Sequence, residues 1–309
     1  MPGIGIINNP HSRKNRKNPK KMIKFGYILG DKGESLKTND LDEVTAVCKQ
    51  FKKRKIDILG INGGDGSNHV ALTKLIEVYN GQPLPKIAFL RGGTMNTISN
   101  SFGIEGTPDS IMFNLVEKYH LGEAFETVKR PVMKIGDKYG FIFGNGLIHN
   151  FLDAYYASGR PSPWTAFTTL FRGTLSALVN GNMAKKLFKK FKARVIVDGH
   201  EWPYDSYTAV TASTIEQIGL GFKPFYRCEE KPGRFHILGI LTSPIGFTME
   251  MPRIHKGLPM RPDRVIEDLA EKVVFESDSP LLYTIDGDTQ DTGNRLEITC
   301  GPTLEIIVH

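Results

Sequence analysis

Residues 56–68 read Ile-Asp-Ile-Leu-Gly-Ile-Asn-Gly-Gly-Asp-Gly-Ser-Asn, an apolar run that stops at a glycine-rich turn. The apolar run predicts a buried strand. Apolar residues then recur at the i, i+3, i+4, i+7 spacing of a helix, at Leu72, Leu75, Ile76 and Tyr79. Three glycines permit a tight turn and let a phosphate approach backbone N–H groups closely. A phosphate-binding loop is one interpretation, and a plain strand-to-helix turn in which Asp65 bonds its own backbone is the other.

The acidic residue in this turn bears on which interpretation holds. A carboxylate at Asp65 would repel phosphate unless a divalent metal or a substrate hydroxyl lay between them, which suits a magnesium-linked or general-base role. Ser67 or Asn68 can cap the following helix or donate to a phosphate oxygen. The chain contains neither GxxxxGK[ST] nor GxGxxG, so a nucleotide site needs support from other segments.

A second glycine segment, Arg91–Asn96, follows the next predicted strand at residues 85–90. Two crossover loops at one edge of a parallel sheet converge on the crevice where open α/β sheets bind ligands. Thr94 and Asn96 can donate to phosphate or ribose, and Arg91 adds positive charge. A plain turn is again the alternative.

The first 125 residues alternate strand and helix signals, which predicts a largely parallel, layered α/β domain. Further strands are expected at 3–7 and 25–29 and helices at 40–51, capped by Asp40, and 95–102. The later chain is punctuated by Gly and Pro, which predicts a mainly antiparallel β domain with one helical insertion near 164–192. Its strands are expected at 140–143, 193–197, 206–212, 234–241, 272–276, 281–285, 295–299 and 303–308.

A third polar segment, Asp286-Gly287-Asp288, follows an apolar strand late in the chain. Its two carboxylates can hold magnesium or accept a hydroxyl proton. Asp-Gly is also typical of a hairpin turn. In isolation the segment leaves both interpretations open.

Five motifs, in order and at comparable spacing, resemble those of the diacylglycerol kinase catalytic-domain family, which includes bacterial soluble lipid kinases and sphingosine and ceramide kinases. They are Asn9-Pro10, Thr38, Gly63–Ser67 with Ser for the family's Thr, Gly93–Asn96, and Asp286–Asp288 with Asp for the family's Glu. The resemblance extends over nearly the whole chain.

The resemblance implies an α/β ATP-binding domain over residues 1–125, like those of NAD kinases and phosphofructokinases. It also implies a β-sandwich lipid-binding domain over 126–309, with the last strand free to pack on the first domain. The residues implied around ATP are Asn9, Thr38, Gly63, Gly64, Asp65, Gly66, Ser67, Gly93, Thr94 and Asn96. Asp288 and Asp65 are the implied catalytic carboxylates, and Asp286 and Asp288 are implied to hold Mg²⁺.

The implied activity is transfer of the γ-phosphate of Mg-ATP to a lipid hydroxyl, with diacylglycerol as the leading acceptor. Sphingosine kinases have an Asp where this chain has Asn150, although Asp153 follows, so a sphingoid or other long-chain lipid is the alternative. Lys231–Arg234 replaces an Asp-Gly segment linked to a structural magnesium in bacterial members, so that metal is not expected. An NAD kinase and a catalytically idle nucleotide- or lipid-binding protein also remain open.

The net charge favours an anionic partner. The chain has 40 Lys and Arg residues and 33 Asp and Glu residues, which gives a net charge of +7. Apolar residues of 164–178 precede lysines of 185–192, as in a helix lying on an anionic membrane surface, though a buried cover helix is the competing interpretation. Nucleic acid is not an expected partner, because no DNA- or RNA-binding motif accompanies the charge. A homo-oligomer is left open.

Composition and cysteine usage indicate a cytoplasmic globular protein that binds peripherally to the inner membrane surface. No apolar run approaches the length of a membrane span, and the first residues do not resemble a secretory signal. The three cysteines, Cys48, Cys228 and Cys300, are widely separated, which argues for a reducing compartment. Cys48 is expected in the core, and residues 252–262 are expected to form a loop.

Overall fold

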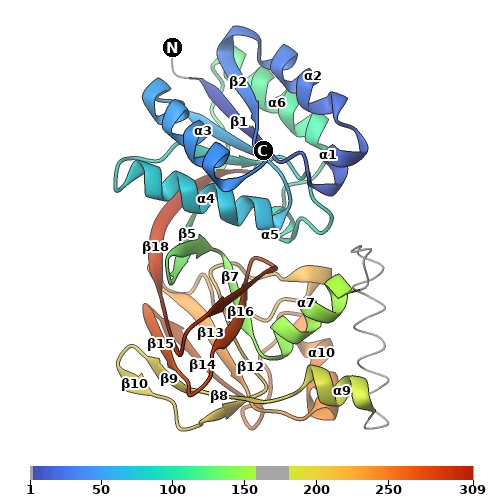
Figure 1. The fold of residues 1–309 in the computed structure, drawn as a ribbon, viewed down its shortest axis with the longest axis vertical. Coiled ribbons are helices and arrows are strands. Elements are labelled where there is room, and N and C mark those ends of the chain that lie inside the picture. Colours follow the sequence, from blue (N-terminus) through green and yellow to red (C-terminus); the bar gives the residue numbers. More distant parts are fainter. Residues whose placement is uncertain (1–2, 158–180, 309) are drawn as a thin grey trace. The chain divides into compact units, whose positions relative to one another are not determined.

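The computed structural model describes residues 3–157 and 181–308, and it divides into two compact units (Figure 1). One unit comprises Met1–Arg130 together with Thr303–His309, and the other comprises Pro131–Pro302. The chain passes between the units twice, within strands β5 (Thr127–Ile135) and β18 (Arg295–Ile307). Sequence analysis places the boundary at residue 125, within the stretch that leads into β5.

The first unit is built on a parallel sheet in the order β18-β4-β3-β1-β2. Its strands, besides the end of β18, are β1 (Ile4–Asn8), β2 (Gly33–Lys37), β3 (Ile58–Asn62) and β4 (Lys86–Phe89). Every residue of β1 and β3 is buried, as in a sheet that helices cover on both faces. The predicted layered α/β domain is confirmed.

Six helices belong to this unit: α1 (Arg13–Lys17), α2 (Lys20–Leu29), α3 (Leu41–Arg54), α4 (Asp65–Tyr79), α5 (Thr97–Ser101) and α6 (Pro108–Leu121). Helix α2 packs on α6, and α3 packs on α4 (Figure 1). The predicted cap of α3 is present, because the Asp40 carboxylate accepts a hydrogen bond of 2.8 Å from the Glu43 backbone N–H.

The strand expected at residues 25–29 is wrong, because this stretch is the second half of helix α2. Met22, Phe25 and Leu29 are buried at helical spacing and form the inner face of the helix. The second strand of the sheet is instead β2, a half-buried edge strand of sequence Gly-Glu-Ser-Leu-Lys that carries almost no apolar signal.

The second unit contains two antiparallel sheets. In the first sheet the strand order is β10-β9-β15-β18, and β5 pairs with both β18 and β6. In the second sheet the strand order is β14-β13-β12-β7-β16-β17. A shared core lies between them, in which the rings of Phe143 and Phe275 are 5.3 Å apart. The predicted antiparallel β domain is therefore present as two packed sheets. The strands are β6 (Lys138–Gly140), β7 (Ile142–Asn145), β9 (Arg194–Val197), β10 (His200–Glu201), β12 (Ala209–Ser213), β13 (Phe235–Ile240), β14 (Val265–Ala270), β15 (Lys272–Glu276), β16 (Leu281–Ile285) and β17 (Asp288–Thr292), with β8 (Phe191–Lys192) and β11 (Ser206–Tyr207) as a separate pair.

Helices α7 (Leu147–Ala157), α9 (Asn182–Leu187) and α10 (Pro244–His255) pack around a further core cluster of this unit. The loop expected at 252–262 is partly wrong, since α10 continues through Pro252 to His255. The two strands expected at 295–299 and 303–308 are the single strand β18. Most of the expected insertion at 164–192 lies outside the described residues.

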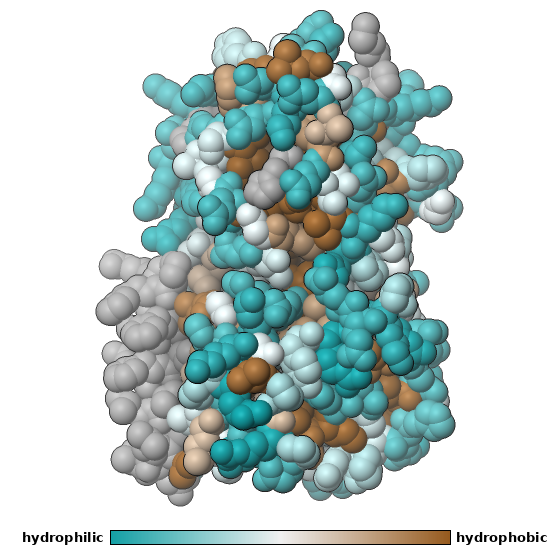
Figure 2. Space-filling model, turned by 180° about the vertical axis from the view of Figure 1, so that it is seen from behind, coloured by the Kyte–Doolittle hydropathy of each residue, from teal (hydrophilic) through white to brown (hydrophobic). Residues whose placement is uncertain are grey.

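The surface view in Figure 2 shows hydrophobic residues in small groups among hydrophilic ones. No helix in the described part of the chain combines the length and apolar character that crossing a membrane requires.

Candidate functional site

The two glycine segments of the first unit lie in direct contact at the carboxyl ends of β3 and β4. A β-carbon on Gly93 would lie 2.3 Å from the Gly64 Cα, and one on Gly92 would lie 2.6 Å from Asn62 Oδ1. A β-carbon on Gly63 would lie 2.2 Å from the Ser67 Cβ. Gly93 is therefore required by close packing of backbone on backbone, and Gly92 and Gly63 by the close approach of the Asn62 and Ser67 side chains. The structure brings the two predicted segments together.

Helix α4 begins within this contact, with Gly64 as its N-cap and no side chain capping it. The N–H groups of a first helical turn have no partners within the helix and carry partial positive charge. Ser67, in that first turn, accepts a 2.8 Å hydrogen bond from Asn9 Nδ2, which leaves its own hydroxyl hydrogen available to donate to a ligand oxygen. The arrangement suits a phosphate, which brings several acceptor oxygens.

A network of buried asparagines holds Asn9 and the glycine segment in place. Asn62 Nδ2 donates to Asn8 Oδ1 at 2.8 Å. Asn15 Nδ2 donates to the Asn9 carbonyl at 2.8 Å and to the Asn62 carbonyl at 2.9 Å. Sequence analysis missed Asn15, which lies in a basic stretch, and the only signal for it was an uncharged residue among lysines and arginines.

Asp65 joins the two glycine segments. Its Oδ2 accepts from the Thr97 N–H at 3.0 Å and its Oδ1 accepts from the Ile98 N–H at 3.1 Å, at the start of α5. Burial raises the pKa of the Asp65 carboxyl, and the hydrogen bonds from Thr97 and Ile98 oppose that rise. The side chain thus bonds the backbone that follows the second glycine segment as well as its own backbone N–H. Its catalytic role stays a prediction, and its contacts favour a positioning role.

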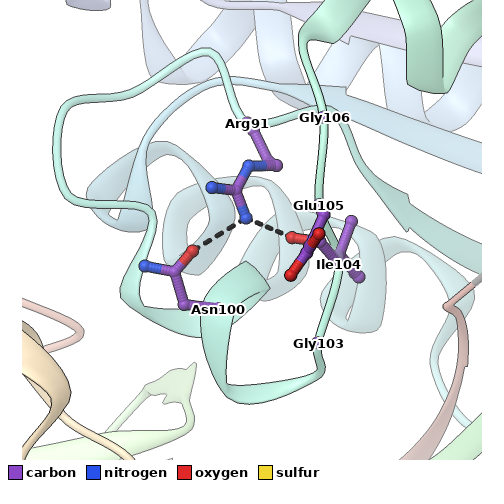
Figure 3. Close-up of a pocket in the computed structure, with 6 residues that line it drawn as sticks. All are labelled: Arg91, Asn100, Gly103, Ile104, Glu105 and Gly106. Atoms are coloured by element: carbon purple, nitrogen blue, oxygen red, sulfur yellow. Dashed lines mark hydrogen bonds between the residues drawn. The ribbon is translucent and has the colours of Figure 1, made fainter.

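Sequence patterns suggest that Arg91 adds positive charge beside a bound phosphate, but its guanidinium bonds the loop that follows the second glycine segment. Its guanidinium donates to Asn100 Oδ1 at 2.7 Å and to the Ile104 carbonyl, and it lines a hollow of about 380 Å³ with residues 103–106 (Figure 3). The cation that reaches the second segment is Lys14, whose Nζ donates to the Arg91 carbonyl at 2.9 Å. Arg91 therefore fixes the loop that follows the segment.

The other predicted residues of this unit differ in their burial and in their hydrogen bonding. Asn96 has a left-handed backbone (φ 51°), and its Oδ1 accepts from the Gly93 N–H at 3.1 Å, so its amide shapes the turn. Thr38 is buried at the end of β2, and its backbone N–H donates to the Asn8 carbonyl at 3.0 Å. Thr94 and Gly66 are half-buried.

In the second unit, Asp286 and Gly287 form the two-residue turn between β16 and β17, with φ of 50° and 86°. Asp286 is 4% exposed, and its Oδ1 accepts from the Phe141 N–H at 2.9 Å and the Ile142 N–H at 2.8 Å. Asp288 is half-buried, and its Oδ2 accepts from Gln290 Nε2 at 3.0 Å. The hairpin interpretation is correct, and Asp288 is the more accessible carboxylate.

The magnesium roles of Asp286 and Asp288 stay predictions. Within residues 3–157 and 181–308, no group of three or more His, Cys, Asp or Glu side chains is arranged to hold a metal ion. Near the replaced Asp-Gly segment, Arg234 pairs with Asp198 at 2.9 Å and Glu271 at 2.8 Å. A guanidinium thus neutralises these two carboxylates.

Cys48 should be inert toward thiol reagents in the folded protein. Burial raises its pKa to about 12, so at pH 8 its thiolate is about 1,000-fold scarcer than for an ordinary cysteine. Iodoacetamide labelling followed by peptide mapping should find Cys48 unmodified in the native protein and modified in urea. Equal labelling rates in the two states would contradict its placement in the core.

Comparison with known proteins identifies the first unit. Residues 4–124 match the model of the diacylglycerol kinase catalytic domain. The resemblance inferred from the motifs is thereby confirmed. No curated protein sequence matches the chain.

Solved structures share this fold over the whole chain. A protein from Bacillus anthracis strain Sterne described as a diacylglycerol kinase has 17% identity and a TM-score of 0.68, with 99% of this chain and 97% of that chain covered. A second from the same strain, described as a candidate diacylglycerol kinase, has 18% identity and a TM-score of 0.72, with 99% and 95% covered. At such identities the likeness establishes the fold, which is that of the NAD kinase-like diacylglycerol kinases.

The residues that match the diacylglycerol kinase catalytic domain include every residue predicted around the nucleotide, from Asn9 to Asn96. Asp286 and Asp288 lie outside the matched residues, so their predicted roles depend on the order of the motifs alone.

Proposed function

We propose that the protein is a lipid kinase that transfers the γ-phosphoryl group of ATP to a lipid hydroxyl, with diacylglycerol as the acceptor. The observation that carries this proposal is the contact between the two glycine segments at the uncapped start of α4. It occurs within the residues that match the kinase catalytic domain.

The residues of the first unit fit the phosphates of ATP. The absence of β-carbons at Gly64 and Gly93 lets the two glycine segments pack together beside the start of α4, and the first turn of that helix supplies N–H donors. The Ser67 hydroxyl adds a donor, which Asn9 holds in place. ATP would supply the phosphoryl group, and Mg²⁺ would neutralise charge on its oxygens.

Asp288 is the residue best suited to take the acceptor's proton. A lipid hydroxyl is a poor nucleophile, and a carboxylate that removes its proton during attack assists transfer. Asp286 accepts from two backbone N–H groups and is 4% exposed, whereas Asp288 is half-buried and is therefore the carboxylate that an acceptor hydroxyl can reach more easily. Asp65 would act through the second glycine segment by fixing Thr97 and Ile98.

The acceptor's headgroup is proposed to be uncharged. Asn150 lies at the position that we aligned with the headgroup-reading Asp of sphingosine kinases. It carries no charge, and its amide nitrogen donates to the Leu187 carbonyl at 3.0 Å. An ammonium headgroup would find no carboxylate at this position, which favours diacylglycerol over a sphingoid base.

Transfer of labelled γ-phosphate from Mg-ATP to lipids in mixed micelles tests the proposal. Diacylglycerol should be labelled by the wild type. Asp288→Asn should lower kcat by about 100-fold or more with the KM for ATP retained. Asp65→Asn should raise the KM for ATP because the second segment loses an acceptor. Asp291→Asn removes an exposed carboxylate on β17, the strand that carries Asp288, and serves as the control.

Two results would overturn the proposal. Phosphorylation of NAD without any lipid product would indicate an NAD kinase. ATP binding with no lipid labelled would indicate a catalytically idle protein on the same fold.

A further inference from the structure

Helix α10 presents apolar side chains to solvent. Ile245 is 48% exposed and Met249 is 55% exposed. They are four residues apart and therefore share one face of the helix. Leu258, just after the helix, is 45% exposed. Single exposed apolar residues are common, but a paired face on one helix followed by a third apolar residue calls for an explanation.

The opposite face of α10 is fixed by a buried charge. Glu250 is fully buried and receives Arg264 Nη1 at 2.7 Å. The ring of Phe247 packs against that of Phe188, which follows α9, with 5.6 Å between the two ring centroids. Rotating the helix to bury Ile245 and Met249 would remove Glu250 from its partner, and breaking a buried ion pair in this way is strongly destabilising. The apolar face is thus held outward by the fold.

Positive charge surrounds this face. Lys256, at the end of the helix, is exposed. Arg253 has a side chain 42% exposed, although its Nε lies 3.7 Å from Glu250 Oε2. Residues 244–264 contain four Arg or Lys and two acidic residues. Three of the four, Arg253, Arg261 and Arg264, lie within 4 Å of the single buried carboxylate of Glu250, which leaves a net positive charge around it. The neighbouring segment 182–192 contains five lysines and no acidic residue. An apolar face with a cationic surround complements an anionic lipid surface.

We propose that the outer face of α10, formed by Ile245, Met249, Arg253, Lys256 and Leu258, docks on the surface of an anionic lipid bilayer. The apolar side chains enter the boundary between headgroups and acyl chains, and the basic ones contact lipid phosphates. This proposal rests on the proposed lipid kinase function in one respect only, because that function explains why the protein would bind to a bilayer.

Vesicle sedimentation without ATP or acceptor lipid tests this surface. The wild type should partition onto phosphatidylcholine vesicles containing phosphatidylglycerol and much less onto phosphatidylcholine alone. The double variant Ile245→Ser/Met249→Ser should bind about tenfold less, because both side chains are solvent-exposed and leave the core intact. Lys256→Glu should lower binding about fivefold, on the anionic vesicles only.

The matched control is Phe113→Ser/Leu121→Ser, which removes two side chains of α6 that are 57% and 67% exposed. It should bind like the wild type. Equal vesicle binding by the α10 double variant and the wild type would overturn the proposal. So would a change in oligomeric state, measured by analytical ultracentrifugation, without a change in vesicle binding, which would identify a second copy as the occupant.

The two proposals fail separately. Vesicle binding that depends on α10 in a protein that phosphorylates no lipid would leave the docking surface intact and remove the kinase. If the protein phosphorylates short-chain diacylglycerol but the α10 substitutions do not change its vesicle binding, the kinase proposal stands and the docking surface is wrong.

Discussion

Gly93→Ala should weaken ATP binding by about 100-fold, because the two glycine segments can no longer pack together. The new β-carbon would lie 2.3 Å from the Gly64 Cα and 3.2 Å from the Gly64 nitrogen. Both are backbone atoms, so no flexible side chain can give way and one segment must move by about an ångström. Calorimetric titration with a non-hydrolysable ATP analogue measures the loss.

Gly26→Ala is the matched control for this substitution. Gly26 lies in α2, and a β-carbon there would meet no atom within 4 Å. Helix propensity then favours alanine by about 0.5–1 kcal/mol, so the control should bind ATP normally and be slightly more stable. A Gly93→Ala protein that binds the analogue as tightly as Gly26→Ala would contradict the close contact of the segments.

Asp286→Ala should lower the free energy of unfolding by about 2–4 kcal/mol. It leaves the N–H groups of Phe141 and Ile142 without their acceptor, and each unsatisfied buried group costs about 1–3 kcal/mol. Alanine also tolerates the left-handed turn position poorly. Urea denaturation followed by circular dichroism measures the change.

Asp288→Ala provides the comparison for Asp286→Ala. Asp288 is half-buried and its Oδ2 accepts from a neighbouring side chain, Gln290, so the expected loss of stability is below about 1 kcal/mol. The two acidic residues on either side of Gly287 should thus differ in role, with Asp286 governing stability and Asp288 governing transfer. Equal stabilities for the two variants would contradict the structural role assigned to Asp286.

Local sequence patterns predicted those parts of the fold that local forces determine. The helix capped by Asp40 and the glycine turn after β3 depend on neighbours within a few residues. The error at residues 25–29 arose because Phe-Gly-Tyr-Ile-Leu is apolar in either conformation, and only the buried positions Met22, Phe25 and Leu29 reveal the helix. The edge strand β2 carried too few apolar residues to be seen.

The motifs predicted which segments form the candidate site but not what each side chain does there. The Asp65 carboxylate bonds to Thr97 and Ile98, 32 and 33 residues away, and no local pattern encodes that contact. The direction of Arg91 likewise depends on Asn100 and on the loop at 103–106. Such tertiary contacts decide whether a polar residue faces a ligand or supports a loop.

The last residues of strand β18 complete the sheet of the first unit. Ile306 pairs with Ile87 of β4, and the Val308 N–H donates to the Glu126 carbonyl at 3.0 Å. These residues follow the whole of Pro131–Pro302 along the chain. On the ribosome, the sheet that carries the glycine segments therefore remains one strand short until the second unit has been synthesised. A chain interrupted during synthesis would lack a finished first unit.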